Sequence, residues 1–209
     1  MGFYPEERDV PARLVCEDVL IRPIRASDAE ADYQALISSR EMLRVWDQSD
    51  WPADDFTIDE NRAELAEHEA DHQARTAFTF TVMDRAEQRC LGCVYLYALG
   101  PILEQLGVPA ADRADVNEPE AYVTFWVRES EVAREFDREL LAELLRWFDA
   151  EWAFQRIALG TNTADVRQQS LFRDAGFAER WRAPVSGRDS AYLVYVRQVA
   201  EAPAHGSVA

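Results

Sequence analysis

The sequence predicts an α+β fold, with a mixed and mostly antiparallel sheet flanked by helices on both faces. Short runs that alternate aromatic, Thr and aliphatic residues indicate strands, and segments with apolar residues three and four positions apart indicate helices. They follow one another in the order β-α-α-β-β-β-α-β-α-β-β, unlike a doubly wound parallel sheet. The 209 residues suit one domain over 14–198, with an N-terminal extension over 1–13 and a flexible tail over 199–209.

The first half of the domain predicts a strand, two helices and a hairpin. The strand begins at Val19, and residues 26–29 carry the Ser and Asp of a helix start, so a helix is expected to about residue 39. Residues 46–56 contain a Pro and several Asp and indicate a loop, and a second helix follows to about residue 74. The segments 78–83 and 90–99 predict an antiparallel hairpin.

The second half predicts the remaining strands and helices. Residues 100–119 contain Gly, Pro and acids and indicate an excursion from the sheet, after which 121–127 form a long strand. A charged turn leads into a helix to about residue 154, whose apolar stripe predicts burial of one face. That stripe consists of Leu140, Leu141, Leu144, Leu145, Phe148 and Trp152.

The chain ends on a strand, a helix and a hairpin. Residues 156–159 predict a short strand, and 164–175 predict a helix that ends at Gly176 in a left-handed cap. Two last strands are expected on either side of a turn at 186–189.

The composition excludes several classes of function. The 22 basic residues are all Arg, and 39 acidic residues bring the formal net charge to −17. This charge argues against binding nucleic acid or an anionic membrane, because phosphates are repelled at long range. No apolar run approaches the ~18 residues of a membrane helix. Three cysteines are too few for a disulfide framework, which favours a reduced, cytoplasmic setting.

Several strings, in this order, resemble the GNAT superfamily of N-acetyltransferases. Residues 19–25 (VLIRPIR) look like the family's first strand, and 90–94 (CLGCV) look like its third strand. Residues 123–127 and the helix after them are similar to its central strand and cofactor helix, and 165–177 are similar to its "N-x-R … L-Y-E-K-x-G-F" segment. The resemblance covers residues 14–197 and implies acetyl-CoA as a co-substrate.

The resemblance also implies where acetyl-CoA binds. In the family, the pantetheine pairs with the end of the central strand, here Trp126 and Val127. The pyrophosphate lies on backbone N–H groups of a Gly-rich turn at a helix N-terminus, which is a natural anion site. On this chain that turn is 132–138.

This turn departs from the family pattern of Gln or Arg, two residues, Gly, one residue, and Gly or Ala. Val132, Glu135 and Asp137 hold those positions, so carboxylates stand where phosphates are expected. Two like charges 4 Å apart repel by ~4 kcal/mol at an effective dielectric of 20. Two interpretations stay open: a solvated helix start, or an unusual anion site in which Arg134 and Arg138 turn inward. The cofactor-binding residues predicted by the second are Trp126, Val127, Arg134, Phe136, Asp137, Arg138 and Asp165.

The catalytic positions are altered as well. The family's general base, a Glu on the central strand, aligns with Tyr122, and Glu120 lies two residues earlier on the same face. Tyr is a poor base because its ordinary pKa is ~10, whereas a partly desolvated Glu120 could serve. The family's proton-donating Tyr aligns with Phe172, which has no proton to donate. Glu120 and Tyr122 are therefore the catalytic candidates; alternatively, Tyr122 packs and Glu120 is a solvated strand-edge residue. Asp165, at the family's Asn position, has the alternative of a helix-start carboxylate.

Two further motifs are read as structural. His68 and His72 complete a literal H-E-x-x-H, the pattern of zinc metalloproteases, but the helix around them is polar and we expect an exposed surface. Cys90 and Cys93 form a C-x-x-C on a strand, where residues three apart face opposite sides, so the thiols are not expected to converge without a bend. No metal site is therefore predicted.

Two hypotheses for the function follow. The first is an acyltransferase that moves acetyl from acetyl-CoA to a primary amine of a small molecule or peptide, with the acidic surface favouring a cationic acceptor. The second is a binding or regulatory module on the same fold that has lost CoA binding. A metalloprotease through His68 and His72 is a remote third. The family resemblance leaves room for a homodimer.

Overall fold

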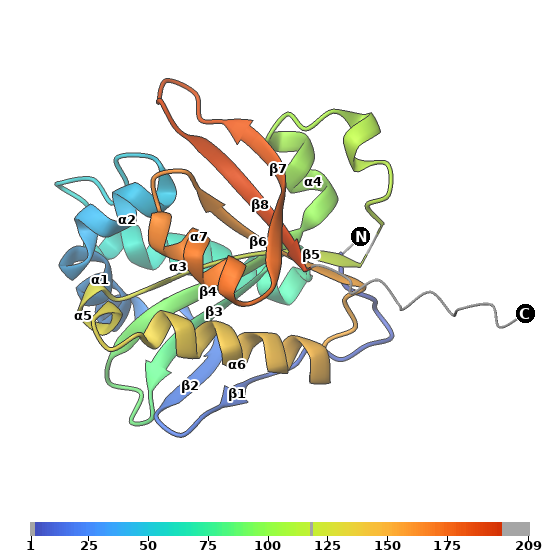
Figure 1. The fold of residues 1–209 in the computed structure, drawn as a ribbon. Helices are drawn as coiled ribbons and strands as arrows, with labels where there is room; N and C mark the ends of the chain where they lie inside the picture. Colours follow the sequence, from blue (N-terminus) through green and yellow to red (C-terminus); the bar gives the residue numbers. More distant parts are fainter. Residues whose placement is uncertain (1–2, 118, 198–209) are drawn as a thin grey trace, which may run out of the picture.

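The computed structural model describes residues 3–117 and 119–197 and contains an eight-stranded sheet in the order β1-β2-β3-β4-β5-β6-β8-β7 within them (Figure 1). The strands are β1 (Leu14–Val15), β2 (Val19–Pro23), β3 (Phe78–Asp84), β4 (Cys90–Ala98), β5 (Glu120–Val127), β6 (Arg156–Asn162), β7 (Phe177–Pro184) and β8 (Ala191–Arg197). The α-helices are α1 (Ala29–Ser38), α2 (Arg40–Asp47), α3 (Ile58–Ala74), α4 (Leu99–Gln105), α5 (Glu129–Val132), α6 (Phe136–Glu151) and α7 (Val166–Asp174).

One strand pair gives the sheet its mixed character. β5 and β6 run parallel, while each of the other neighbouring pairs in the described sheet is antiparallel. The β5–β6 pairing extends only from Glu120↔Arg156 to Val123↔Leu159, whereas β5 stays paired with β4 as far as Val127. The two parallel strands therefore separate over the second half of β5, and a space opens between them.

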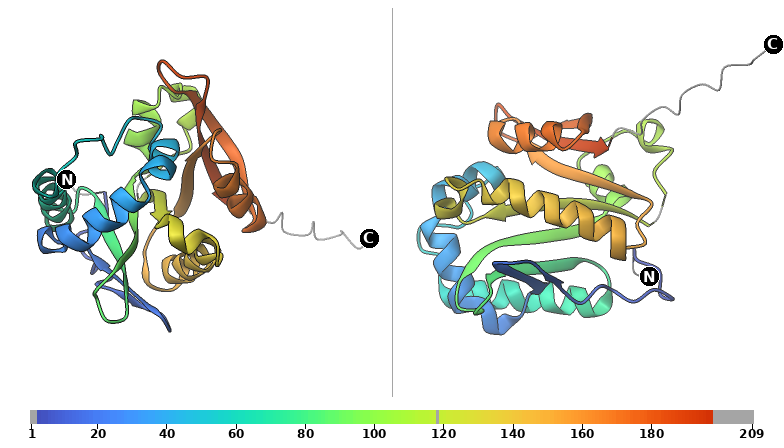
Figure 2. Two further views of the ribbon diagram at one scale, coloured as in Figure 1. Left: turned by 90° about the vertical axis from the view of Figure 1, so that its left-hand side faces the viewer. Right: turned by 60° about the horizontal axis from the view of Figure 1, so that its bottom comes forward.

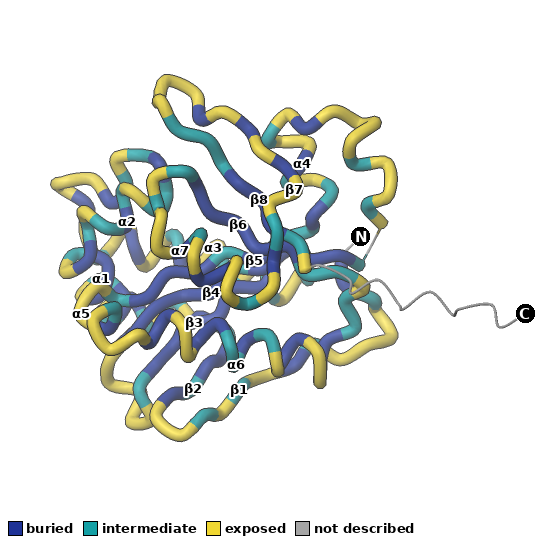
Figure 3. Tube along the Cα trace, in the orientation of Figure 1, coloured by how far each residue is buried: buried dark blue, intermediate teal, exposed yellow. Residues whose placement is uncertain are grey.

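Helices cover both faces of the sheet, as predicted. The stripe on α6 packs against one face, where Leu140, Leu144 and Phe148 join the strand residues Val123 and Phe125 in the largest core cluster. The helices α1 to α3 lie on the other face (Figure 2). Burial follows this layering, since the central strands are largely buried and the connecting loops are exposed (Figure 3).

Three α-helices were not predicted: α2, α4 and the four-residue α5, which lies within the charged turn expected before the long helix. α2 begins directly after α1, with only Ser39 between them, so the sequence predicts one helix followed by a loop. α4 lies in the stretch 100–119 that was expected to be an irregular excursion. Its Pro101 occupies the first turn, where proline is tolerated because the N–H that it lacks would have no partner within the helix. A Gly-Pro pair at this place is therefore not a break.

Three local predictions are confirmed. α1 begins where expected, after a short 3₁₀ turn over Ala26–Asp28. α3 begins at a capping box in which the hydroxyl of Thr57 accepts the N–H of Glu60. Gly176 follows α7 with a φ of +83°, the left-handed conformation expected for it.

The segment expected to be an N-terminal extension contributes to the core. Phe3 and Tyr4 are buried, and Tyr4 packs edge-on against Phe78 and Trp152. Its hydroxyl also accepts the N–H of Ala153 at 3.0 Å. The tail expected over 199–209 lies outside the described residues. In the described part of the chain, no helix has the length and apolar character needed to cross a bilayer.

The interpretation of His68 and His72 as exposed helix surface is wrong. Both side chains are half-buried and face the sheet: the His68 ring packs on Tyr95, and the His72 ring packs edge-on against Phe78 and Phe80. A long helix that rests on a sheet buries only a narrow stripe of side chains. The residues around His68 and His72 are polar, so the sequence does not show that these two belong to the stripe.

The expectation that the thiols of Cys90 and Cys93 point apart is also wrong. Val82 pairs with Gly92 while Met83 pairs with Cys90, so β4 carries one extra residue at this point and forms a bulge. The bulge supplies the bend that an ordinary strand lacks. Both cysteines consequently belong to the core cluster beneath α1, and Leu91 belongs to the cluster beneath α6.

Candidate functional site

A cavity of about 660 Å³ lies at the end of the sheet where β5 and β6 separate. Its wall comes from four parts of the chain: α2, the end of β5, the turn before α6, and α7. The lining residues are Met42, Val45, Trp46, Phe125, Trp126, Val127, Glu129, Val132, Ala133, Asp137, Ala164, Asp165, Val166, Arg167, Gln168 and Leu171. Most of these side chains are apolar, with a few polar groups among them, which is typical of a pocket for an organic ligand.

The β5 wall of the cavity offers backbone groups. The Phe125 carbonyl points away from β4, because it accepts a hydrogen bond from Nε2 of Gln168 at 2.9 Å. Alternate residues of a strand direct their N–H and C=O to the same side, so Val127 turns its own groups toward the space that β6 has left. Of the two predicted strand-end residues, both line the cavity, and Val127 is the one whose backbone faces it.

Gln168 is the most unusual polar group in the wall. The residue is 6% exposed, its Nε2 donates to the Phe125 carbonyl, and its Oε1 is buried with no hydrogen-bond partner among the described residues. An unsatisfied buried acceptor costs about 1–3 kcal/mol, which a ligand N–H at this place would recover. The first turn of α7 carries Gln168 into the cavity, and Asp165 caps that turn by accepting the Gln168 N–H at 2.9 Å.

The turn before α6 has a left-handed residue at a position where the resembled motif has glycine. Glu135 has φ +61°, a conformation natural to glycine, at the position where the resembled motif has its first Gly. The left-handed residue lets the chain turn from the short α5 into α6. Ala133 and Asp137 from this turn face the cavity.

Asp137 lies at the N-terminal end of α6 and is bound by a cation from α7. Arg167 donates from Nε and Nη2 to the two carboxylate oxygens at 2.5 and 2.7 Å. The Asp137 side chain is 8% exposed, against 44% for Arg167. The hydrogen bonds with Asp137 raise the pKa of Arg167.

The predicted cofactor residues therefore fall into two groups. Trp126, Val127, Asp137 and Asp165 line the cavity, where burial raises the pKa of Asp165. Arg134, Phe136 and Arg138 lie outside the wall formed by the described residues. Arg134 pairs with Glu131 at 2.7 Å, Arg138 pairs with Asp174 at 3.0 Å, and Phe136 is buried in the core under α6.

The two catalytic candidates, Glu120 and Tyr122, have different surroundings. Glu120 begins β5 at the closed end of the parallel pair, where it is 3.6 Å from Arg156, and burial raises its pKa. Tyr122 lies one step closer to the separation, and its ring crosses Gly160 of β6 so closely that a Cβ at Gly160 would be 1.9 Å from the Tyr122 hydroxyl. Burial raises the pKa of Tyr122 well above its ordinary value, so its hydroxyl keeps its proton.

Tyr122 belongs to a group of tyrosines on the face of the sheet below α2. Tyr97 is its cross-strand partner on β4, and Tyr192 of β8 pairs with Asn162, two residues beyond Gly160 on the same face of β6. Burial raises the pKa of Tyr97 to about 12, and the nearby charges of Asp71 and Asp47 add to the rise. This face thus combines aromatic rings with two carboxylates.

Sequence reasoning missed Arg167, Gln168 and Trp46. Arg167 and Gln168 stand beside Asp165 in the string that resembles the family, and the helical position three after the cap signals that Gln168 faces the sheet. The sequence predicts a loop from residue 46, whereas Trp46 belongs to α2. The backbone carbonyls of Val45 and Trp46 accept hydrogen bonds from Asn162 on β6, which ties α2 to the separated strand.

The two motifs that could hold a metal differ in their geometry. Among the described residues, His68 and His72 belong to no group of three ligating side chains. Asp32, Cys90 and Cys93, however, bring their ligand atoms within 4.8 Å of one another.

Comparison with known families and structures agrees with this architecture. A family model described as "Acetyltransferase (GNAT) domain" matches residues 18–178, while none of the curated proteins matches the sequence. Among solved structures, the RimL ribosomal L7/L12 α-N-protein acetyltransferase in complex with coenzyme A has a TM-score of 0.67 at 16% identity, covering 88% of this chain and 96% of that one.

Two other solved structures show the same fold. The ribosomal-protein-S5-alanine acetyltransferase from Vibrio fischeri has a TM-score of 0.66 at 17% identity, covering 90% of this chain and 96% of that one. The microcin C7 self-immunity acetyltransferase MccE, in complex with acetyl-CoA and AMP, has a TM-score of 0.67 at 13% identity, covering 91% and 98%. At these identities the likeness establishes the fold.

Proposed function

Since the chain belongs to the GNAT acetyltransferase family, we propose that it transfers acetyl from acetyl-CoA to a primary amine of a small molecule or a peptide. The observation that carries this proposal is the cavity between β5 and β6, whose wall contains the unsatisfied Oε1 of Gln168. Similar structures bind CoA and acetyl-CoA, which supports acetyl-CoA as the co-substrate.

The cavity suits the pantetheine arm of CoA. That arm carries amide N–H and C=O groups on an apolar chain, and the wall offers the Gln168 acceptor, the backbone of Val127 and apolar side chains. A ligand amide N–H would donate to Oε1 of Gln168. The N–H and C=O of Val127 would bond amide groups of the ligand, as they would bond a neighbouring strand.

Among the described residues of the wall, the phosphate end of the ligand has one cation to meet. Arg167 is half-exposed and its fork suits a phosphate, but Asp137 already holds it. Binding of the pyrophosphate therefore requires Arg167 to be shared between Asp137 and the ligand. This is a different solution from the inward-turned Arg134 and Arg138 predicted from sequence.

Tyr122 is the proton donor that we assign to the reaction. The amine nitrogen attacks the thioester carbon, the C–S bond breaks, and the leaving thiolate takes a proton while the new ammonium loses one to solvent. Tyr122 stands beside the strand separation and carries the hydroxyl that Phe172 lacks, which supports it as the donor. Burial raises the pKa of Tyr122, which keeps the hydroxyl protonated at neutral pH but also makes it a weaker acid. Phe172 itself is fully buried in the core.

The face of the sheet that carries Tyr97, Tyr122 and Tyr192 suits a cationic acceptor. Asp47 and Asp71 act electrostatically on Tyr97, and a ring-lined site with carboxylates favours an ammonium group. Polyamines, aminoglycoside-like amines and peptide N-termini share this chemistry.

Calorimetry and an acetylation assay test the proposal. Acetyl-CoA and desulfo-CoA are titrated first, and a panel of the three amine classes is then assayed for thiol release. Absence of binding at millimolar CoA would contradict the enzyme. That outcome would instead support the non-catalytic module that has lost CoA binding, which the Asp137 carboxylate at the start of α6 favours. Binding of CoA without turnover of any amine in the panel would contradict the proposed acceptor classes.

A further inference from the structure

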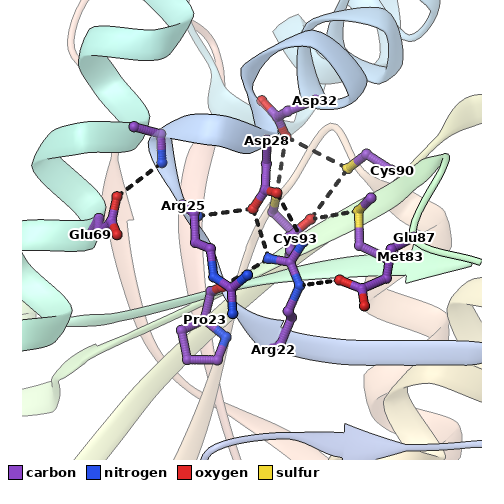
Figure 4. Close-up of polar contacts among 12 residues, drawn as sticks. Arg22, Pro23, Arg25, Asp28, Asp32, Glu69, Met83, Glu87, Cys90 and Cys93 are labelled. Atoms are coloured by element: carbon purple, nitrogen blue, oxygen red, sulfur yellow. Dashed lines mark hydrogen bonds and ion pairs between the residues drawn. The ribbon is translucent and has the colours of Figure 1, made fainter.

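A second group of chemically reactive side chains lies in the core beneath α1. The carboxylate of Asp32 on α1 faces the thiols of Cys90 and Cys93 on β4, with Oδ1 3.6 Å from the Cys90 sulfur and 3.4 Å from the Cys93 sulfur (Figure 4). All three residues are buried, with exposed fractions of 3%, 0% and 1%. The cavity between β5 and β6 does not include them.

The backbone holds this arrangement in place. The bulge in β4 turns both thiols to one face, and α1 presents Asp32 directly above them. The other carboxylate oxygen, Oδ2, accepts a hydrogen bond from Nδ2 of Asn61 on α3 at 3.1 Å. Asn61 is itself fixed by donating to the carbonyl of Ala29 at 3.1 Å. Such an outer hydrogen bond orients a carboxylate toward its ligand.

The protein gives this carboxylate weak partners. A thiol is a poor hydrogen-bond donor, and a buried carboxylate ordinarily requires a cation or several strong donors. In the described residues no ion pair reaches Asp32; the nearby Arg22 binds Asp28 and Glu87 instead. Among the described residues, the cluster thus has ligand atoms, burial and the amide hydrogen bond from Asn61, but no cation to balance the carboxylate.

We propose that Asp32, Cys90 and Cys93 bind one thiophilic divalent cation of the zinc class. Sulfur and oxygen ligands of a tetrahedral zinc ion are about 3.5 Å apart, given metal distances of about 2.3 and 2.0 Å, and the two separations here are 3.4 and 3.6 Å. Binding breaks both S–H bonds, forms two metal–sulfur bonds and releases two protons to solvent. Two thiolates favour zinc over calcium or magnesium, which prefer oxygen.

The remaining side of the site is also lined by sulfur and oxygen. The Thr81 hydroxyl is 3.7 Å from the Cys90 sulfur and 3.4 Å from the sulfur of Met83. A bound ion would tie α1 to β4 on the face where Trp126 packs, so the role that we propose for it is structural.

The full-length chain tests this directly. It is unfolded, refolded with ZnCl₂ or CoCl₂, freed of excess metal and analysed for metal content and for absorption. We expect about one metal per chain, a near-ultraviolet sulfur-to-cobalt absorption, and release of two protons on binding. Folded protein that contains no metal and shows no such absorption would overturn the proposal and leave a hydrogen-bonded cluster.

Variants separate the cluster from adventitious binding. Cys90→Ser, Cys93→Ser and Asp32→Asn should lose the metal, while Cys16→Ser, which removes the cysteine outside the cluster, should retain it. Metal held equally by all four variants would overturn the assignment. If a cluster variant does not fold, the metal content and cobalt spectrum of the unsubstituted chain and of Cys16→Ser still decide.

Discussion

Arg167 donates hydrogen bonds from Nε and Nη2 to the two carboxylate oxygens of Asp137, at 2.5 and 2.7 Å. This ion pair joins α7 to the first turn of α6 in the wall of the cavity. The carboxylate occupies the end of a helix that would otherwise attract a phosphate. The cation best placed to bind a phosphate in the described wall is thus engaged by an acid of the same chain.

Replacing Asp137 should strengthen CoA binding. Asp137→Ala removes the competing charge and frees Arg167, so we expect the Kd for CoA to fall about tenfold, equivalent to about 1.4 kcal/mol. Arg167→Ala should raise the Kd for CoA by a similar factor. Calorimetry measures both, and Asp174→Ala, which breaks the exposed pair with Arg138, is the matched control. Unchanged affinity in Asp137→Ala would show that the phosphates bind elsewhere.

The buried oxygen of Gln168 should contribute to CoA affinity. Gln168→Met keeps the length of the side chain but loses Oε1, together with the Nε2 hydrogen bond to Phe125. We expect CoA binding to weaken about tenfold, as for one lost hydrogen bond to a buried group. Gln169→Met is the control, because Gln169 is on the same helix and donates to the carbonyls of Asn162 and Thr163. Equal effects of the two changes would mean that Gln168 acts through the fold.

Gly160 and Tyr122 should be coupled. Gly160→Ala places a methyl group 1.9 Å from the Tyr122 hydroxyl and forces the ring to move, which costs about 1–3 kcal/mol of stability and lowers kcat. Tyr122→Ala removes the clash, so the double variant should lose less stability than the sum of the two single changes. Additive losses, measured by denaturant unfolding, would contradict the close contact.

Stability should fall in mild acid because of two histidines. Burial lowers the pKa of His68 and of His72 below the usual 6.5, so the unfolded chain binds more protons than the native one below that pH. The free energy of unfolding should therefore drop as pH falls from 6.5 toward the folded pKa values. Unfolding curves from pH 8 to 5 measure it, and His68→Gln with His72→Gln should flatten the profile. A profile of unchanged slope in that variant would assign the loss to other groups.

The fold was readable where periodicity and caps agree. The stripe on α6 and the cap at Gly176 each combine two independent signals, and both are confirmed. α4 was missed because Gly100 and Pro101 are usually breaks, although a first turn accepts them.

The candidate site was harder to predict because it depends on pairings between distant segments. The turn at 132–138 was located from sequence, but its charges were assigned to Arg134 and Arg138. Those side chains find partners in Glu131 and Asp174, whereas Arg167, about 30 residues away, reaches Asp137. In a chain with this excess of acids, nearness in sequence does not indicate which carboxylate an Arg selects.

The φ of +61° at Glu135 separates two properties that a phosphate-binding turn usually unites. The path of the backbone is already that of a glycine turn, and only the side chains oppose an anion. A left-handed non-glycine residue costs roughly 1–2 kcal/mol, so Glu135→Gly would both relax the chain and remove a charge. Substitutions at Glu135 and Asp137 alone should therefore be enough to improve nucleotide binding, with no change to the path of the backbone.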